Sequence, residues 1–118
     1  MTTKSTLALV HLTQQPRRRG DGPPPLLLLL HGYGSNEADL FGLAPYVDPR
    51  FLVVSARAPY TLTYGSYAWF EIGWTNSGIT IDARQAEASR KLVLEFLGAA
   101  IEAYGADPKQ VYLCGFSQ

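Results

Sequence analysis

The sequence predicts an α/β fold built on a mainly parallel sheet with one helix on each face. Three short apolar runs, 26–30, 51–56 and 111–114, have the length of strands, and continuous apolar runs of this kind are typical of strands buried on both faces. They alternate with two segments of helical character, 35–47 and 82–104. Buried strands that alternate with helices favour a parallel sheet covered on both sides.

The segments around these strands are assigned from local composition. Residues 5–13 are β-like and predict an outer strand, in which His11 is expected to be partly exposed. Residues 14–25 are rich in Pro, Gly and Arg and predict a loop. The Arg run at 17–19 is better explained as part of this solvated loop than as a docking patch. Residues 57–81 are expected to form a second, long loop.

Capping residues support both helices. Residues 35–36, Ser and Asn, are good caps for the first helix, and Glu37 and Asp39 would then lie in its first turn, where the helix dipole favours acidic groups. Residues 82–104 carry an apolar stripe opposite a charged one, which is the pattern of an amphipathic helix. Gly105 follows as a C-cap.

Composition excludes several classes of protein. The 118 residues, 47% of them apolar, suit part or all of one globular domain, and Lys plus Arg balance Asp plus Glu at 10 each. The zero net charge does not suggest a nucleic-acid partner, and the run 26–30 is too short to form a transmembrane segment. The single cysteine, Cys114, allows no internal disulfide and favours a reducing, cytoplasmic location; we expect it to be buried.

The chain order predicts where a ligand would bind. Strand 26–30 is expected in the middle, with 51–56 on one side and 111–114 on the other, because this arrangement sends the two helices to opposite faces. From strand 51–56 the chain returns across the sheet to the other side of strand 26–30. The order in which strands are added therefore reverses between 26–30 and 111–114. Open α/β sheets bind ligands outside the carboxyl ends of their strands at such a point. The two loops that meet there read HGYGSN and GFSQ.

The second of these loops matches most of a nucleophile elbow. That motif, Gly-x-Ser-x-Gly between a strand and a helix, is a tight strained turn that exposes the serine hydroxyl above the sheet. Gly115 and Ser117 match, and the second glycine would follow Gln118. The elbow works with two backbone N–H groups that form an oxyanion hole, one after the serine and one on the earlier loop. Gln118 and Tyr33 hold those positions.

Four blocks of the sequence together resemble the phospholipase/carboxylesterase family of α/β hydrolases, the group that includes acyl-protein thioesterases. They read LLLLLHGYGSNEADLFGLAPYV, FLVVSARAPY, YAWFEI and DPKQVYLCGFSQ, and the likeness covers about residues 24–118. The resemblance implies a serine esterase or thioesterase that hydrolyses small-molecule acyl esters or thioesters through an acyl-enzyme, without a cofactor or metal. It also implies that residues 1–118 are the N-terminal part of a single α/β-hydrolase domain, an incomplete fold that ends at the elbow.

The family's site residues can be carried over only where this sequence matches. The resemblance implies that Ser117 is the nucleophile and that Tyr33 and Gln118 donate to the oxyanion through backbone N–H groups. His31, Gly32 and Gly34 would shape the oxyanion loop. The sequence departs from the family by stopping before the second elbow glycine, the acid and the catalytic histidine.

No histidine or acid in the chain fits the missing positions. In this fold the triad runs Ser, then Asp or Glu, then His, and both His11 and His31 precede the serine. We interpret His31 as a hydrogen-bonded structural residue of the loop. The acids Asp39, Asp48 and Asp82 are interpreted as helix-cap or loop residues. The triad Asp and His are therefore expected in a missing C-terminal half of the same enzyme, and the chain alone is expected to be inactive.

The segment 57–81 is unusually aromatic. It carries six aromatic residues between positions 60 and 74, on the same edge of the sheet as the serine. They are Tyr60, Tyr64, Tyr67, Trp69, Phe70 and Trp74. Two interpretations stay open: they form the wall of an apolar acyl pocket, or they anchor a long loop to the body. Trp69 is our choice for the pocket.

Two alternatives to the esterase hypothesis remain at this point. The chain could be a truncated, non-catalytic α/β module that folds with a partner or serves as a scaffold. It could also belong to another α/β hydrolase, such as a dienelactone hydrolase or a peptidase. The residues encoded after Gln118 would separate these hypotheses: a glycine followed by a later Asp and His favours the esterase, and a natural stop codon favours the truncated module.

Overall fold

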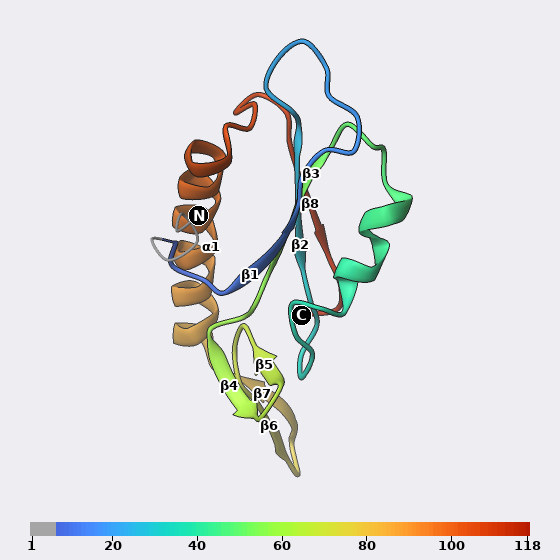
Figure 1. The fold of residues 1–118 in the computed structure, drawn as a ribbon. Coiled ribbons are helices and arrows are strands. Elements are labelled where there is room, and N and C mark those ends of the chain that lie inside the picture. The colour runs from blue at the N-terminus through green and yellow to red at the C-terminus, as the bar shows by residue number, and fades with distance from the viewer. Residues whose placement is uncertain (1–6) are drawn as a thin grey trace.

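The structure, a computed structural model, describes residues 7–118. A four-stranded sheet lies between a long helix and a short one (Figure 1). The elements in chain order are β1 (His11–Gln14), β2 (Leu26–Leu30), η2 (Leu40–Tyr46), β3 (Leu52–Ala56), β4 (Tyr60–Thr63), β5 (Ser66–Ala68), β6 (Ile72–Thr75), β7 (Gly78–Ile81), α1 (Ala83–Tyr104) and β8 (Val111–Gly115). The outer strand expected at 5–13 begins at His11, and residues 5 and 6 lie outside the described part.

The sheet has the strand order β1-β3-β2-β8, as the sequence predicts. β2 pairs in parallel with both β3 and β8, and β1 pairs antiparallel with β3. The register aligns Leu30 with Ala56 on one side and with Gly115 on the other, so all three parallel strands end at the same level. The fold is therefore a mainly parallel α/β-hydrolase-like sheet, and the loops after β2 and β8 leave from adjacent strands.

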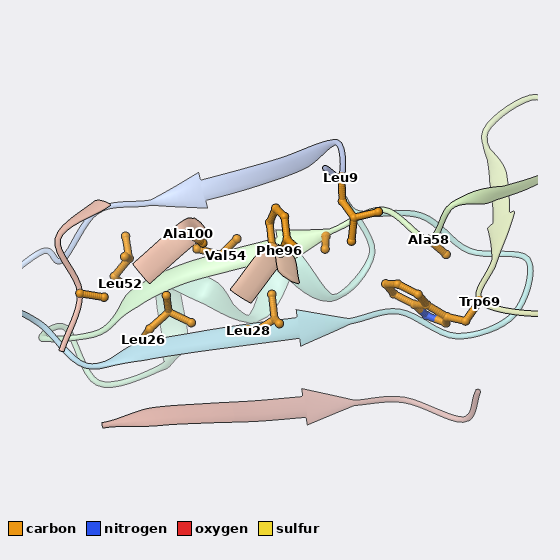
Figure 2. Packing of buried hydrophobic residues seen from close by; sticks show 11 residues of the cluster. Leu9, Leu26, Leu28, Leu52, Val54, Ala58, Trp69, Phe96 and Ala100 are labelled. Atoms are coloured by element: carbon orange, nitrogen blue, oxygen red, sulfur yellow. The ribbon is translucent and has the colours of Figure 1, made fainter. Parts of the chain in front are cut away.

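Each face of the sheet packs against one helix. Toward α1 the core contains Leu26, Leu28 and Val54 of the strands with Phe96 and Ala100 of the helix, all nearly inaccessible to solvent (Figure 2). Toward η2 a smaller cluster is formed by Leu29, Val53 and Ala44. Alternate residues of β2 thus face opposite layers, which is why its unbroken leucine run suits a strand buried on both sides.

The helix α1 matches its prediction closely. Asp82 is the N-cap and its side chain accepts a hydrogen bond from the Gln85 N–H, and Gly105 is the C-cap with a φ of 68°. The first helix differs from its prediction, because it is a 3-10 helix that begins at Leu40 rather than just after Ser35. The Asn36 side chain instead closes a local turn by accepting from the Ala38 N–H, and Pro45 sits inside the helix without a donor of its own.

The predicted long loop at 57–81 is wrong. Two antiparallel hairpins, β4/β5 and β6/β7, occupy most of this segment (Figure 1). Gly65 and Gly78 provide their turns with φ values of 80° and 120°, which L side chains rarely adopt. The alternation of Thr, Tyr, Ile and Trp around these two glycines is the hairpin signal that the loop prediction overlooked.

The burial of strand β8 differs from its prediction. The strand lies at the edge of the sheet, as the predicted strand order places it, but the run 111–114 was interpreted as buried, and Tyr112 and Leu113 are 51% and 56% exposed. Cys114 is exposed for the same reason, against the expectation that it would be buried. Within residues 7–118, no segment pairs with the outer edge of this strand, so its apolar side chains are uncovered.

Candidate active site

The turn after β8 has the backbone of a nucleophile elbow. The Phe116 N–H donates to the Leu30 carbonyl at 3.1 Å, and the chain then turns sharply at Ser117, whose φ is 61°. Among residues 7–118, Ser117 is the only non-glycine residue with positive φ. Such a conformation strains the backbone of an L-residue and is concentrated at functional sites. The strain at Ser117 is therefore a local reason to consider it the reactive residue.

The loop after β2 packs directly on this elbow. A Cβ placed on Gly32 would lie 3.1 Å from the Phe116 carbonyl oxygen, 3.1 Å from the Phe116 ring and 3.4 Å from the Ser117 Cβ. A side chain at this position would therefore be tighter than almost all real Cβ contacts, and the elbow would have to yield by a few tenths of an ångström. The absence of a side chain at Gly32 lets the two loops touch, which confirms that they meet at the expected edge of the sheet.

The hairpin β4/β5 fixes the far side of the same loop. The Gly34 N–H donates to the Tyr67 carbonyl and the Tyr67 N–H donates to the Ser35 carbonyl, both at 2.9 Å. The Ser66 hydroxyl donates to the Gly34 carbonyl at 2.8 Å. Gly34 itself has a φ of 80°, which glycine adopts without strain. The loop therefore has a defined conformation, held from both sides.

His31 is buried and fully occupied by backbone partners. Its Nε2 accepts a hydrogen bond from the Ala58 N–H at 3.0 Å, and its Nδ1 lies 2.8 Å from the Gly32 carbonyl oxygen. A backbone N–H can only donate, so Nε2 carries no proton and Nδ1–H is the donor to Gly32. A neutral imidazole with both nitrogens engaged fixes the loop and has no lone pair free to deprotonate a serine.

Trp69 connects the loop to the hairpin region. Its indole N–H donates to the His31 carbonyl at 2.7 Å, and its ring packs beside the His31 ring with centroids 5.5 Å apart. Figure 2 shows it just beyond the carboxyl end of β2. The side chain also lines a groove of about 510 Å³ that includes Ser117, but Trp69 itself is only 6% exposed. Its assignment to a substrate pocket stays a prediction.

The side chain of Gln118 makes contacts that the sequence did not reveal. Its Oε1 accepts from the Trp69 N–H at 2.8 Å and its Nε2 donates to the Phe70 carbonyl at 2.7 Å. The sequence offered one indication of these contacts: an amide side chain can donate and accept at once, and so can bind two successive backbone groups. The elbow is thereby attached to the segment between the two hairpins.

Two backbone N–H groups near the serine have no protein acceptor. Tyr33 follows the glycine that touches the elbow, and Gln118 follows the serine. Within residues 7–118, neither N–H donates to another protein group, and the Ser117 hydroxyl has no hydrogen-bond partner either. Unpaired donors beside a strained serine are able to receive a negatively charged oxygen.

A partly buried ion pair between Arg57 and Glu37 stabilises the segment that follows β2. The Arg57 guanidinium donates two hydrogen bonds to the Glu37 carboxylate, at 2.8 and 2.6 Å, and stacks over the Tyr67 ring at 4.4 Å. The Ser55 hydroxyl donates to the Glu37 carbonyl at 2.7 Å. The bonds from Arg57 hold the pKa of Glu37 below its usual value of 4.5. Together these contacts tie the segment after β2 to the end of β3.

This ion pair predicts a pH-dependent contribution to stability. Because the folded state lowers the pKa of Glu37, the contribution is complete above about pH 4.5 and is lost as the pH falls through the lower folded pKa. Glu37→Gln should reduce the free energy of unfolding at pH 7 by roughly 1.5–3 kcal/mol, the usual value for hydrogen bonds to charged groups. Urea unfolding of the unaltered chain and of Glu37→Gln, measured from pH 7 to pH 3, should show the difference in unfolding free energy shrinking below pH 4.5. A difference that stays constant over this range would contradict the assignment.

His11, Asp39 and Asp48 have structural partners. His11 was expected to be partly exposed but is buried, because Tyr104 and Phe96 of α1 cover it, and its Nε2 lies 2.7 Å from the Tyr104 hydroxyl. Asp48 pairs with Arg50, and Asp39 accepts from Ser35. Within the described residues, no group of three or more His, Cys, Asp or Glu could hold a metal, and no helix is long and apolar enough to cross a membrane.

A parallel sheet that presents a strained serine after one strand and a glycine loop after the adjacent strand defines the class of α/β hydrolases. Within that class the chain belongs to the Phospholipase/Carboxylesterase family, whose model matches residues 17–118. No curated protein matches the chain at a significant level.

Solved structures agree with this assignment. The carboxylesterase of Bacillus cereus is 31% identical, with a TM-score of 0.75 over 96% of this chain and 50% of its own. Esterase PE8 is 25% identical, with a TM-score of 0.77 over 93% of this chain and 53% of its own. A carboxylesterase from Mesorhizobium loti, at 21% identity and a TM-score of 0.76 over 95% of this chain and 50% of its own, shares the fold. The chain thus spans about half the length of these proteins.

Proposed function

We propose that this chain is the N-terminal part of a serine hydrolase that cleaves acyl esters or thioesters, and that Ser117 is its nucleophile. The observation that carries the proposal is the positive φ of Ser117 at the end of β8, in contact with the glycine loop after β2. Such backbone strain is stored where function requires it. The family supports an esterase over other reaction classes.

The proposed reaction has two steps. The Ser117 Oγ attacks the acyl carbonyl carbon, its proton passes to a histidine base, and the carbonyl oxygen becomes an oxyanion that accepts from the Tyr33 and Gln118 N–H groups. The carbon–oxygen or carbon–sulfur bond then breaks, and the alcohol or thiol leaves with that proton. Water, deprotonated by the same base, attacks the acyl-enzyme and releases the carboxylic acid and the serine.

The histidine base and the acid are proposed to lie in residues encoded after Gln118. Within the described residues His31 has both nitrogens engaged, and His11 is held by Leu9 and Tyr104 on the α1 side of the sheet. The solved esterases are about twice as long as this chain. A missing C-terminal half is therefore the proposed partner. We further infer an acyl-protein thioesterase-like subtype and a cytoplasmic location, the latter from the single cysteine.

The groove beside Ser117 supports the same proposal. It runs between α1 and the outer strand β8, and its lining is mostly apolar, including Leu94 and Leu113, which are 55% and 56% exposed. The elbow motif requires a helix directly after the serine, and that helix would start at this groove. We therefore assign the part of the groove that Leu94 and Leu113 line to the following helix. Trp69, which lines the same groove near Ser117, remains the proposed residue of the acyl pocket.

Covalent labelling of the extended chain tests the function. The extended chain comprises residues 1–118 and the residues that its reading frame encodes after Gln118. A serine-reactive fluorophosphonate should label it, with the label mapped by mass spectrometry to Ser117, and Ser117→Ala should lose labelling and activated-ester hydrolysis by about 10⁶-fold in kcat. The exposed Ser77 offers the matched control, because Ser77→Ala should change neither.

Substrate class is tested with the same protein. Activated esters and matched thioesters of short and medium acyl chains should be hydrolysed equally well with and without a chelator, because the proposed reaction needs no metal. Removal of the acyl group from an S-acylated peptide would support the thioesterase subtype. Activity that disappears with a chelator and returns with zinc, or a stop codon directly after Gln118, would contradict the proposal.

A further inference from the structure

We propose that the side chains of Gln118 and Trp69 form a clamp that holds the two loops of the oxyanion hole at a fixed separation. Both would then be positioning residues for the reaction, since the clamp acts through the backbone N–H groups of Tyr33 and Gln118. This inference rests on the proposed function and adds to it a role for two side chains that do not themselves touch the reacting atoms.

Trp69 is the residue through which the two loops are connected. Its backbone N–H donates to the Gln118 side chain at 2.8 Å, and its indole N–H donates to the His31 carbonyl at 2.7 Å. The first bond reaches the elbow and the second reaches the start of the glycine loop. A third bond, from the Ser89 hydroxyl to the Trp69 carbonyl, anchors the same residue to α1. One rigid residue thus spans both loops and the helix layer.

Gln118 completes the clamp with both ends of its amide. Its acceptor binds Trp69 and its donor binds the carbonyl of Phe70, the next residue. Two bonds to successive backbone groups fix the side chain in both position and rotation. Because the same residue carries one of the proposed oxyanion donors, fixing its side chain also restrains the peptide that presents that N–H. Methionine at this position has neither polar group, and glutamate has no donor when ionised.

The burial of the clamp makes its bonds matter. Trp69 is 6% exposed and His31 is fully buried, so water cannot readily replace the bond between the indole N–H and the His31 carbonyl. The two bonds of Gln118 are partly buried. Loss of the indole N–H would leave the His31 carbonyl unpaired, and loss of the Gln118 amide would release the elbow from Trp69 and Phe70, so in either case we expect the loops to shift.

A small shift is expected to be enough to impair the reaction. The two proposed donors come from loops after different strands, and beyond the β2–β8 pairing they are related by the contact at Gly32 and by this clamp. An oxyanion hole works only if both N–H groups lie close to 3 Å from the developing charge. A misplacement of about 1 Å can reduce the rate by about 10²-fold.

The test compares clamp variants of the extended chain with matched controls. Gln118→Met and Trp69→Phe should each reduce kcat for an activated ester by about 10²-fold, with KM changed by less than about threefold. The controls are Gln85→Met, which removes a similar pair of amide contacts with Glu71, and Tyr46→Phe at the exposed end of η2. Both should keep kcat within about twofold.

Two further measurements separate positioning from simple loss of structure. The double variant Gln118→Met/Trp69→Phe should lose no more than about threefold in kcat beyond the worse single variant, since the two residues act as one unit. In Gln118→Glu, the protonated carboxyl can donate to the Phe70 carbonyl and the ionised one cannot. Its kcat relative to the unaltered protein should therefore rise as the pH falls through the carboxyl pKa, a change that Gln118→Met should not show.

The outcomes distinguish the clamp from the function on which it rests. Clamp variants that unfold as the unaltered protein does but lose kcat alone support the inference. Clamp variants that retain full kcat would contradict the clamp. The proposed function would still be supported in that case if the fluorophosphonate labels Ser117. If the unaltered extended chain neither hydrolyses esters nor reacts with the fluorophosphonate, both proposals are wrong. A loss of kcat in the controls as large as in the clamp variants would also overturn the inference.

Discussion

The isolated 118-residue chain is expected to show no measurable ester hydrolysis, with kcat at least about 10⁶-fold below that of the extended chain. In a serine hydrolase the loss of the serine or the histidine alone has an effect of this size. Within the described residues His31 cannot act as the base, because its Nε2 is occupied by the Ala58 N–H and its Nδ1 by the Gly32 carbonyl. The measurement is activated-ester turnover by the purified chain.

The same chain is expected to associate in solution. Among residues 7–118 no strand pairs with the outer edge of β8, and Leu113 of this strand and Phe116 just after it are 56% and 63% exposed. Unpaired edges with apolar faces promote pairing with other chains. Size-exclusion chromatography should show oligomers, and addition of the separately expressed C-terminal half should restore a monomeric complex and activity. A soluble monomer that hydrolyses esters at near full rate, and loses this on Ser117→Ala, would overturn the prediction.

The sheet was predictable because its signals are strong and local. The unbroken leucine run in β2 and the apolar run in β3 indicate strands buried on both sides. Two helices on opposite faces then require the chain to return past β2, which predicts the strand order that the structure confirms. Helix α1 was predictable from its stripe and its two caps, Asp82 and Gly105. The adjacency of the loops after β2 and β8 follows from that order alone.

Other features depend on contacts that a single sequence does not report. The exposure of Cys114 depends on which segments cover β8, and the burial of His11 depends on Tyr104, 93 positions away along the chain. The turn that the Asn36 side chain closes with the Ala38 N–H precedes η2, which begins only at Leu40. The amide bonds of Gln118 cross 48 and 49 positions to a hairpin region that was expected to be a loop.

The largest effect expected from a single substitution outside the triad is at Gly32. A Cβ there would meet the Phe116 carbonyl oxygen and ring at 3.1 Å and the Ser117 Cβ at 3.4 Å. Since the carbonyl belongs to the backbone of the elbow, relief requires the two loops to separate by a few tenths of an ångström, and we expect this shift to misplace the Tyr33 N–H. Loss of one oxyanion donor reduces kcat by about 10²–10³-fold, or roughly 2.7–4 kcal/mol of transition-state stabilisation.

Gly32→Ala in the extended chain should therefore lower kcat by about 10²-fold or more, and the bulkier Gly32→Val should lower it further, with KM less affected. Gly42 is the matched control, because a Cβ there meets no atom within 4 Å, and Gly42→Ala should keep kcat within about twofold. Steady-state kinetics gives kcat, and thermal unfolding checks that each variant is folded. A folded Gly32→Val that retains the original kcat would mean that the loop after β2 supplies no oxyanion donor, and the Tyr33 N–H would lose its proposed role.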